Sequence, residues 1–234
     1  IRVLVPYSRS LYFNDKGQER GLSAENTRDF ERWINKKYTK TLGKRPLTVF
    51  IIPTTRDKLL PDVASGIGDI AVGNLTVTEE RLKTVDFASP AAQTGVKELV
   101  VTGPKSPAIA STEDLAGKTV HVRKASSYYE SLEALNRRFK KEGKPAAELL
   151  LVPDALEDED MMEMLNAGLL EVVVVDDWKA KMWAQILPKI RVNEQVVVRE
   201  GGKIGWAIRK GSPKLETEIL DVHKSYLKKQ GVVP

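Results

Sequence analysis

The same order of secondary structure is predicted twice along this chain of 234 residues. The spacing of apolar residues predicts the order strand–helix–strand–helix–strand over residues 1–72, and the same order is predicted again over residues 119–175. Strands that alternate with helices in this way are typical of a mostly parallel sheet with helices on its faces. We therefore expect an α/β fold of two similar lobes.

Local patterns give the expected bounds of each element. Phe30, Trp33 and Ile34 fall on one face of a helix that Ser23 would cap, and Pro53 is expected to end a strand. The first half is predicted to contain strands at 1–5, 47–52 and 69–72, a turn at 14–17 and helices at 23–38 and 55–64. The second half is predicted to contain strands at 119–122, 149–152 and 171–175 and helices at 126–140 and 156–166.

The tail adds a strand at 204–208 and a helix from Ser212 to about Lys229. It is too short for a third lobe and most simply returns to the first. Residues 102–107 are rich in Gly, Pro and Ser, a composition typical of a surface connection. We expect lobe 1 to comprise residues 1–103 and 198–234, and lobe 2 residues 104–197.

Two segments of the halves also match each other without gaps. Residues 65–74 and 167–176 each contain a helix end, a glycine, an acidic residue, a buried strand and then a polar residue. The polar residues are Asn74 and Asp176, and both are predicted at the carboxyl end of a strand, where open α/β sheets bind ligands. Chance could produce one such match, but the repeated element order favours two lobes that face one cleft.

Composition narrows the class of protein. Hydrophobic residues make up 41% and charged residues 29%, which is typical of a globular chain. The absence of cysteine excludes disulfides and thiolate chemistry. The formal net charge is +5, but basic residues such as Lys36 and Arg137 alternate with acidic ones on predicted helices. We interpret them as solvated helix faces rather than nucleic-acid contacts, although the excess would favour an anionic ligand or wall polymer.

The sequence predicts binding without catalysis. Its only histidines are His121, inside a predicted strand, and His223, and no recognised nucleophile, zinc or phosphate-loop motif occurs. The acidic run at 157–160 is interpreted as the first turn of a helix, where negative charge suits the helix dipole. We expect no metal and no cofactor.

The segment after the third strand carries the first candidate site. Alternation places Asn74, Thr76 and Thr78 on one side of an extended segment, and Thr78 then caps a turn that contains Arg81. An arginine in this position could bind a carboxylate through two hydrogen bonds. The alternative, equally weighted, is a surface arginine that pairs with a nearby acidic residue.

A second candidate site is predicted in the other half. Ser126 and Ser127 open a helix, whose N–H groups and hydroxyls could bind an anion, or they are an ordinary helix cap. Asp176 ends a buried strand and could bind an ammonium group, or it caps the next helix.

These residues together resemble family 3 of the periplasmic solute-binding proteins, the polar amino-acid receptors of ABC importers. The stretches 68–70, 76–81 and 85–90 resemble the most recognisable motif of that family, and the similarity covers essentially the whole chain. The resemblance implies a type II periplasmic-binding-protein fold, in which two lobes joined by two hinge crossovers close on a ligand. It implies that Arg81 binds the α-carboxylate of an amino acid.

The same resemblance implies further roles. Ser126 and Ser127 would add contacts from the opposite lobe, while Thr76, the carbonyl of Asn74 and Asp176 would receive the α-ammonium. Amino-acid receptors usually supply an aromatic side chain from the N-terminal loop, and the nearest residues here are Ser10, Tyr7 and Tyr12. Tyr128, near the start of the second-lobe helix, is a further candidate for lining the side-chain subsite, or it packs in the core.

A closer resemblance is to the receptor-like module of the membrane-bound lytic transglycosylase F family. Residues 5–13, 53–59, 122–132 and 163–168 carry it. It implies a periplasmic module, associated with the outer membrane in a full-length protein that carries a murein-cleaving domain outside this chain. We expect a monomer that binds an amino acid or wall-derived peptide, with murein or an ABC permease as partner. The alternative is a murein-binding portion of a lytic enzyme that acts directly on glycan.

Overall fold

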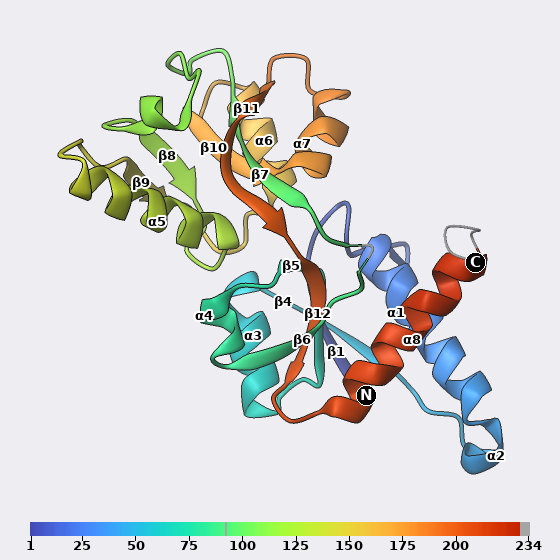
Figure 1. Cartoon of the computed structure of the whole chain (residues 1–234). Helices are drawn as coiled ribbons and strands as arrows, with labels where there is room; N and C mark the ends of the chain where they lie inside the picture. Colours follow the sequence, from blue (N-terminus) through green and yellow to red (C-terminus); the bar gives the residue numbers. More distant parts are fainter. Residues whose placement is uncertain (92, 230–234) are drawn as a thin grey trace. The chain divides into compact units, whose positions relative to one another are not determined.

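The computed structural model describes residues 1–91 and 93–229, with side chains as far as residue 226. The chain forms two compact units, Ile1–Thr94 with Lys203–Pro234, and Gly95–Gly202 (Figure 1). Residue 92 and residues 230–234, which were expected to belong to lobe 1, lie outside the described residues. The two units are called unit 1 and unit 2 below.

The chain passes from unit 1 to unit 2 just before β7 (Val96–Thr102) and returns to unit 1 just after β11 (Arg191–Gly202). These two strands pair antiparallel with each other, and β7 also pairs with β10 (Val172–Asp176), so both strands belong to unit 2. The expected boundaries at 103/104 and 197/198 therefore lie at the far end of β7 and within β11. The chain enters unit 2 along β7 and leaves it along β11, which explains why these two strands run in opposite directions.

Unit 1 is built on one mixed sheet of strands in the order β4-β1-β5-β12-β6. β1 pairs parallel with β4 and β5, whereas β12 pairs antiparallel with β5 and β6. The strands are β1 (Arg2–Pro6), β4 (Phe50–Thr54), β5 (Ile70–Thr76), β6 (Val85–Ala88) and β12 (Ile204–Arg209). The tail thus returns to the first lobe, as its length predicted.

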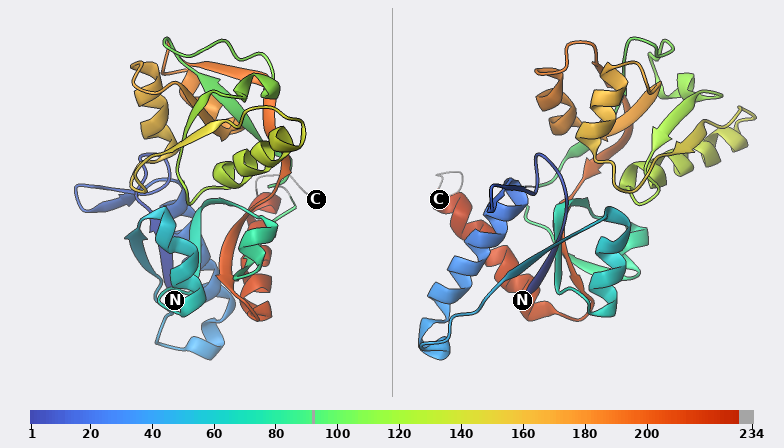
Figure 2. Two further views of the ribbon diagram at one scale, coloured as in Figure 1. Left: turned by 90° about the vertical axis from the view of Figure 1, so that its left-hand side faces the viewer. Right: turned by 180° about the vertical axis from the view of Figure 1, so that it is seen from behind.

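Helices cover both faces of this sheet (Figure 2). Val3 and Val5 pack on one face with Phe30 of α1 (Leu22–Lys37) and Ile219 of α8 (Pro213–Lys229). Leu4 points to the other face and packs with Leu59 and Val63 of α3 (Arg56–Ser65). The period of two along β1 therefore separates two apolar layers.

Pro53 lies inside β4 rather than ending it, so the expectation of a strand at 47–52 was wrong. β4 is an edge strand, and its Phe50 N–H donates to the carbonyl of Ile1 on β1. Alternation then turns the nitrogens of Ile51 and Pro53 away from β1, where a missing N–H breaks no ladder bond. A proline at that outward position is compatible with the strand.

Unit 2 contains an antiparallel sheet in the order β10-β7-β11 and a parallel pair of β8 (Thr119–Val122) and β9 (Glu148–Leu151). The expected parallel arrangement therefore holds here only for β8 and β9. Leu132 and Phe139 of α5 (Ser127–Lys141) pack on one face. Helices α6 (Asp158–Asn166) and α7 (Asp177–Ala184) pack on the other.

The remaining elements are short. They are the hairpin β2 (Phe13–Asp15) and β3 (Gln18–Arg20), the helices α2 (Thr39–Leu42) and α4 (Glu79–Leu82), and a 3-10 turn at Thr112–Leu115. Within the described residues, no helix combines the length and apolar character needed to cross a membrane.

Candidate functional site

The end of β5 carries an irregularity at Asn74. This residue has a φ of 54°, a left-handed conformation that non-glycine residues seldom adopt and that Asn tolerates better than most. The register with β12 shifts here, from Ala71 opposite Ala207 to Leu75 opposite Gly205. Asn74 therefore lies in a β-bulge, a feature that often re-aims the backbone next to binding sites.

Arg81 is held in place by the residues that precede it. Thr78 is buried and caps α4, where its hydroxyl accepts a 3.1 Å hydrogen bond from the backbone N–H of Arg81. The Nη1 atom of Arg81 donates a 2.7 Å hydrogen bond to the carbonyl of Thr76. The cap fixes the backbone of Arg81, and the second bond fixes the plane of its guanidinium. Asn74, Thr76 and Arg81 thus lie on one short segment of unit 1.

The two N-terminal tyrosines differ in exposure. Tyr12 is buried in the core of unit 1, and this burial raises the pKa of its hydroxyl, as does the nearby Glu19. Tyr7 is 63% exposed, and its ring centre lies 6.1 Å from that of Tyr12. Tyr12 therefore supports the loop, whereas Tyr7 is the tyrosine available at the surface of unit 1.

The loop between these tyrosines is seated on the start of α1. The N–H groups of Leu22 and Ser23 donate to the carbonyls of Ser10 and Leu11, at 3.2 and 2.8 Å. Gly21 is the N-cap residue, and this position requires glycine because an added Cβ would lie 2.3 Å from the Leu11 carbonyl oxygen. The expected cap, Ser23, lies inside the helix instead.

In unit 2, the hydroxyls of Ser126 and Ser127 are both engaged. Ser126 is the N-cap of α5, since its Oγ accepts from the N–H of Tyr129 and donates to the carbonyl of Arg123. Ser127 Oγ donates a 2.6 Å hydrogen bond to the buried carboxylate of Glu98 on β7. A ligand near this helix start would therefore meet backbone N–H groups rather than these hydroxyls.

Tyr128 and Asp176 meet inside unit 2. The backbone N–H of Asp176 donates a 3.1 Å hydrogen bond to the hydroxyl of Tyr128, which itself donates to Asp158 at 2.9 Å. Burial and the neighbouring carboxylates raise the pKa of Tyr128 well above its ordinary value. Tyr128 packs in the core of unit 2 and supports the strand end that carries Asp176. This placement corresponds to the core alternative for Tyr128.

Sequence reasoning missed a group of buried charges around these residues. Asp158 accepts from Arg123 and from Lys179, each at 2.9 Å, and all three side chains are almost fully buried. Glu98 lies opposite Asp176 in the register of β7 and β10. We call Glu98, Arg123, Asp158 and Lys179 the buried charge cluster. The available signal was Glu98, a charge directly before the apolar run 99–101, whereas the run at 157–160 was interpreted only as a helix start.

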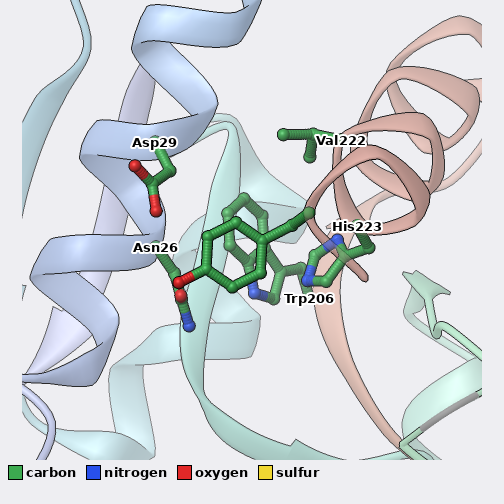
Figure 3. A pocket seen from close by; sticks show the side chains of 6 residues that line it. Asn26, Asp29, Trp206, Val222 and His223 are labelled. Carbon is green, nitrogen blue, oxygen red and sulfur yellow. The ribbon is translucent and has the colours of Figure 1, made fainter. Parts of the chain in front are cut away.

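A separate small hollow of about 40 Å³ lies between α1 and α8 of unit 1 (Figure 3). The ring of His223 meets that of Trp206 edge-on at 5.3 Å, and Asn26 and Asp29 approach from α1. None of the residues predicted from sequence lines it. Its size suits a few water molecules rather than an amino acid.

The chain matches the model of the bacterial extracellular solute-binding proteins, family 3, over residues 3–231. The chain belongs to this family. The match confirms the resemblance drawn from the motif around Arg81, and it identifies the chain as a solute-binding domain. Members of family 3 are described as extracellular, which agrees with an extracytoplasmic location.

Similar curated proteins are named membrane-bound lytic murein transglycosylase F. The one from Pseudomonas fluorescens (strain Pf-5) is 26% identical over 98% of this chain and 43% of its own length. The one from Saccharophagus degradans is 30% identical over 76% of this chain and 33% of its own length. The family 3 domain described here therefore spans less than half the length of these relatives.

Solved structures of amino-acid-binding proteins share the fold. An ancestral arginine-binding protein bound to arginine is 26% identical, covers 98% of this chain and 92% of its own, and gives a TM-score of 0.69. A substrate-binding protein of an amino acid ABC transporter from Streptococcus pneumoniae, bound to L-arginine, gives 0.73 at 18% identity, with coverage of 98% and 90%. These similarities confirm the expected type II periplasmic-binding-protein fold.

Proposed function

We propose that this family 3 domain binds an amino acid or a wall-derived peptide in the periplasm and acts as the regulatory module of a lytic transglycosylase. The domain itself performs no chemistry. Occupancy of its site reports that wall peptide is present, and the response is made elsewhere in the full-length protein. The names of the relatives support this role, as does the share of their length that the chain spans.

The observation that carries the proposal is the anchoring of Arg81 on the carbonyl of Thr76. A guanidinium has five N–H donors in a fixed plane, and a carboxylate is the group that best matches it. We assign Arg81 to the α-carboxylate of the ligand. The bulge at Asn74 supports a second role, in which its carbonyl and Thr76 receive the α-ammonium, with Tyr7 beside the ligand side chain.

Unit 2 supplies the remaining contacts when the ligand draws the two units together by a hinge motion. Because the hydroxyls of Ser126 and Ser127 are engaged, their contribution is assigned to the backbone N–H groups that begin α5. Asp176 is assigned to the ligand ammonium. Tyr12 and Tyr128 act indirectly, by supporting Tyr7 and Asp176 from within the two cores.

Delivery of an amino acid to an ABC permease is the second candidate function. It is supported by the structural similarity to substrate-binding proteins of amino acid transporters. The two functions predict different ligands, since a transport receptor prefers a free amino acid and a wall sensor prefers a peptide that contains murein-specific residues.

A thermal unfolding screen against free amino acids and purified muropeptides tests the proposal. A ligand at 100 times its Kd stabilises the fold by about 2.7 kcal/mol, which gives a clear shift in the melting temperature. Preferential stabilisation by muropeptides supports the sensor, and preferential stabilisation by one amino acid supports the transport receptor. If only peptide-free glycan strands stabilise the protein, the proposed ligand class is wrong.

Incubation with purified murein tests the absence of catalysis. His121 is buried in β8, and His223 packs on Trp206. We expect no soluble fragments above a control without protein. Release of anhydro-muropeptides by a preparation free of other lytic enzymes would support the alternative, a domain that acts directly on glycan.

A further inference from the structure

The outer edge of β9 in unit 2 is open. In the part of the chain that the structure describes, β9 has one strand neighbour, β8, with Leu149 opposite Val120 and Leu151 opposite Val122. The N–H groups of Glu148 and Val152 donate toward β8, to Lys118 and Val122. Because alternate residues of a strand direct their backbone groups to opposite sides, Leu149 and Leu151 direct theirs to the open edge.

This edge lacks a proline, one of the features by which proteins prevent strand addition. The edge strand β4 of unit 1, which pairs parallel with β1, offers a comparison. It has Pro53 at an outward position, so one backbone N–H donor is missing from its open edge. β9 contains no proline, and Leu150 and Leu151 are 47% and 50% exposed. An open edge with exposed leucines is a template for another strand.

The helix α5 runs beside β9 (Figure 1) and carries the cationic residues Arg137 and Lys140. Asn136 fixes the distance between α5 and the start of β9, because its side chain exchanges hydrogen bonds of 2.8 and 3.0 Å with the backbone of Ala147. A shallow groove of about 520 Å³ follows, lined by Glu133, Asn136, Arg137, Lys140, Lys144, Ala146 and Leu149.

The positive charge of the groove comes mainly from Arg137 and Lys140. Lys144 is paired with Glu142 at 2.9 Å. The exposed Arg137 and Lys140, one turn apart, form no ion pair within the described part of the chain. The groove therefore combines backbone donors and acceptors of one strand with two unneutralised positive charges.

We propose that the β9 edge and the α5 groove bind an extended acidic segment of a partner protein by strand addition. The open N–H and C=O groups of Leu149 and Leu151 pair with the backbone of the segment. Arg137 and Lys140 select carboxylates on the side of the segment that faces α5. Leu149 packs toward α5, so alternation turns the exposed Leu150 to the opposite face, where it contacts apolar residues at alternate positions of the segment. The preferred sequence therefore alternates acidic and β-branched residues.

Fluorescence anisotropy with a labelled hexapeptide of alternating glutamate and valine tests this surface. We expect saturable binding that is at least tenfold tighter than binding of the matching lysine–valine peptide. Methylation of the backbone nitrogens along one edge of the glutamate peptide should weaken binding at least tenfold. If the methylated peptide binds as well as its parent, strand addition is wrong and the groove is a general polyanion site.

Variants of the protein test the open edge of β9 and the positive charges of the groove. Leu151→Pro removes an outward N–H without removing a bond to β8, and should weaken binding at least tenfold, whereas Leu151→Val keeps the N–H and should bind normally. Arg137→Glu with Lys140→Glu should abolish the preference for the acidic peptide. Lys189→Glu with Arg191→Glu makes the same charge change elsewhere in unit 2 and should preserve it.

Binding of the peptide is independent of the proposed ligand site, to which neither Arg137 nor Lys140 is assigned. The charge-reversed protein should show the wild-type thermal shift with the amino acid or muropeptide found in the screen. Equal binding of both peptides to the charge-reversed and wild-type proteins would overturn the proposal, as would no binding of the glutamate peptide to wild type.

Discussion

The Nη1 atom of Arg81 lies 2.7 Å from the carbonyl oxygen of Thr76, five residues earlier in the chain. The hydroxyl of Thr78 holds the backbone of the same arginine, so the side chain is anchored at both ends. An arginine fixed in this way loses little conformational entropy when it binds a carboxylate, because its orientation is already set.

Arg81→Ala should weaken ligand binding by about 2 kcal/mol or more, because a bound carboxylate would lose its charged partner. The melting temperature of the unliganded protein should stay close to that of wild type. Titration calorimetry with the ligand from the thermal screen measures the change. Arg32→Ala, a change at an exposed arginine of the same unit, is the control. Unchanged affinity in Arg81→Ala would remove Arg81 from the site.

Asn74→Gly should keep both stability and ligand affinity, since glycine adopts a positive φ without steric cost and the proposed ligand contact is the backbone carbonyl. Asn74→Val should destabilise the protein by about 1–2 kcal/mol, because a β-branched residue disfavours the left-handed conformation. Urea unfolding and calorimetry give the two quantities. An Asn74→Gly protein that folds but no longer binds would show that the side chain, not the carbonyl, contacts the ligand.

Asp176→Asn should reduce ligand-induced compaction, because a ligand shifts a conformational equilibrium only through its different affinity for the two states. Under the proposal that difference comes from unit 2. Small-angle scattering with and without ligand should give a smaller radius of gyration for liganded wild type and a smaller change for Asp176→Asn. Wild type that binds normally without any change in radius contradicts hinge closure, provided that the unliganded form is open.

Asp158→Asn should destabilise unit 2 by about 3 kcal/mol or more, because Arg123 and Lys179 would remain buried after losing a shared counter-charge. Asp154→Asn changes an exposed carboxyl four residues earlier and should have little effect. Urea unfolding of both variants provides the comparison. Equal stability of the two would mean that the buried charge cluster contributes nothing net.

His223 should make stability depend on pH. Burial lowers the pKa of its imidazole below the ordinary value of 6.5, although a hydrogen bond to Ile219 opposes the shift. The unfolded chain therefore takes up a proton at a higher pH than the folded chain, so stability is complete above about pH 6.5 and falls as the pH is lowered toward the folded pKa. Urea unfolding at pH 7.5 and 5.5 should show a smaller difference for His223→Gln than for wild type. His121, whose pKa burial also lowers, accounts for part of the remainder.

Local pattern was sufficient to predict most helices of the fold. Phe30 and Ile34 recur at helical spacing, and both are buried in the core of unit 1. Strand partners were harder to predict, because pairing depends on contacts between distant residues. The insertion of β12 between β5 and β6 joins residues more than a hundred positions apart, and no local pattern records that choice.

The candidate site likewise has some features that local sequence predicts and others that depend on distant residues. The cap at Thr78 and the place of Arg81 depend on residues within one turn, and the structure agrees with both. The surroundings of Asp176 depend on Glu98, Tyr128 and Asp158, which come from three separate elements. A carboxylate inside a run of acidic residues has the pattern of a solvated helix start, so its burial becomes visible only after the chain folds.

The place of β12 in the sheet also sets an order for folding during synthesis. Among the strands of the described residues, β12 is the only neighbour of β6, and it follows the whole of unit 2 in the chain. A ribosome that adds 5–20 residues per second needs roughly 5–20 seconds to make the intervening segment. During that interval Val85 and Phe87 of β6 lack the strand that later covers their edge, whereas unit 2 already has all its strands. During this time the nascent chain is therefore most exposed to misassociation and chaperone capture at unit 1, and completion of the sheet of unit 1 waits until unit 2 has been translated.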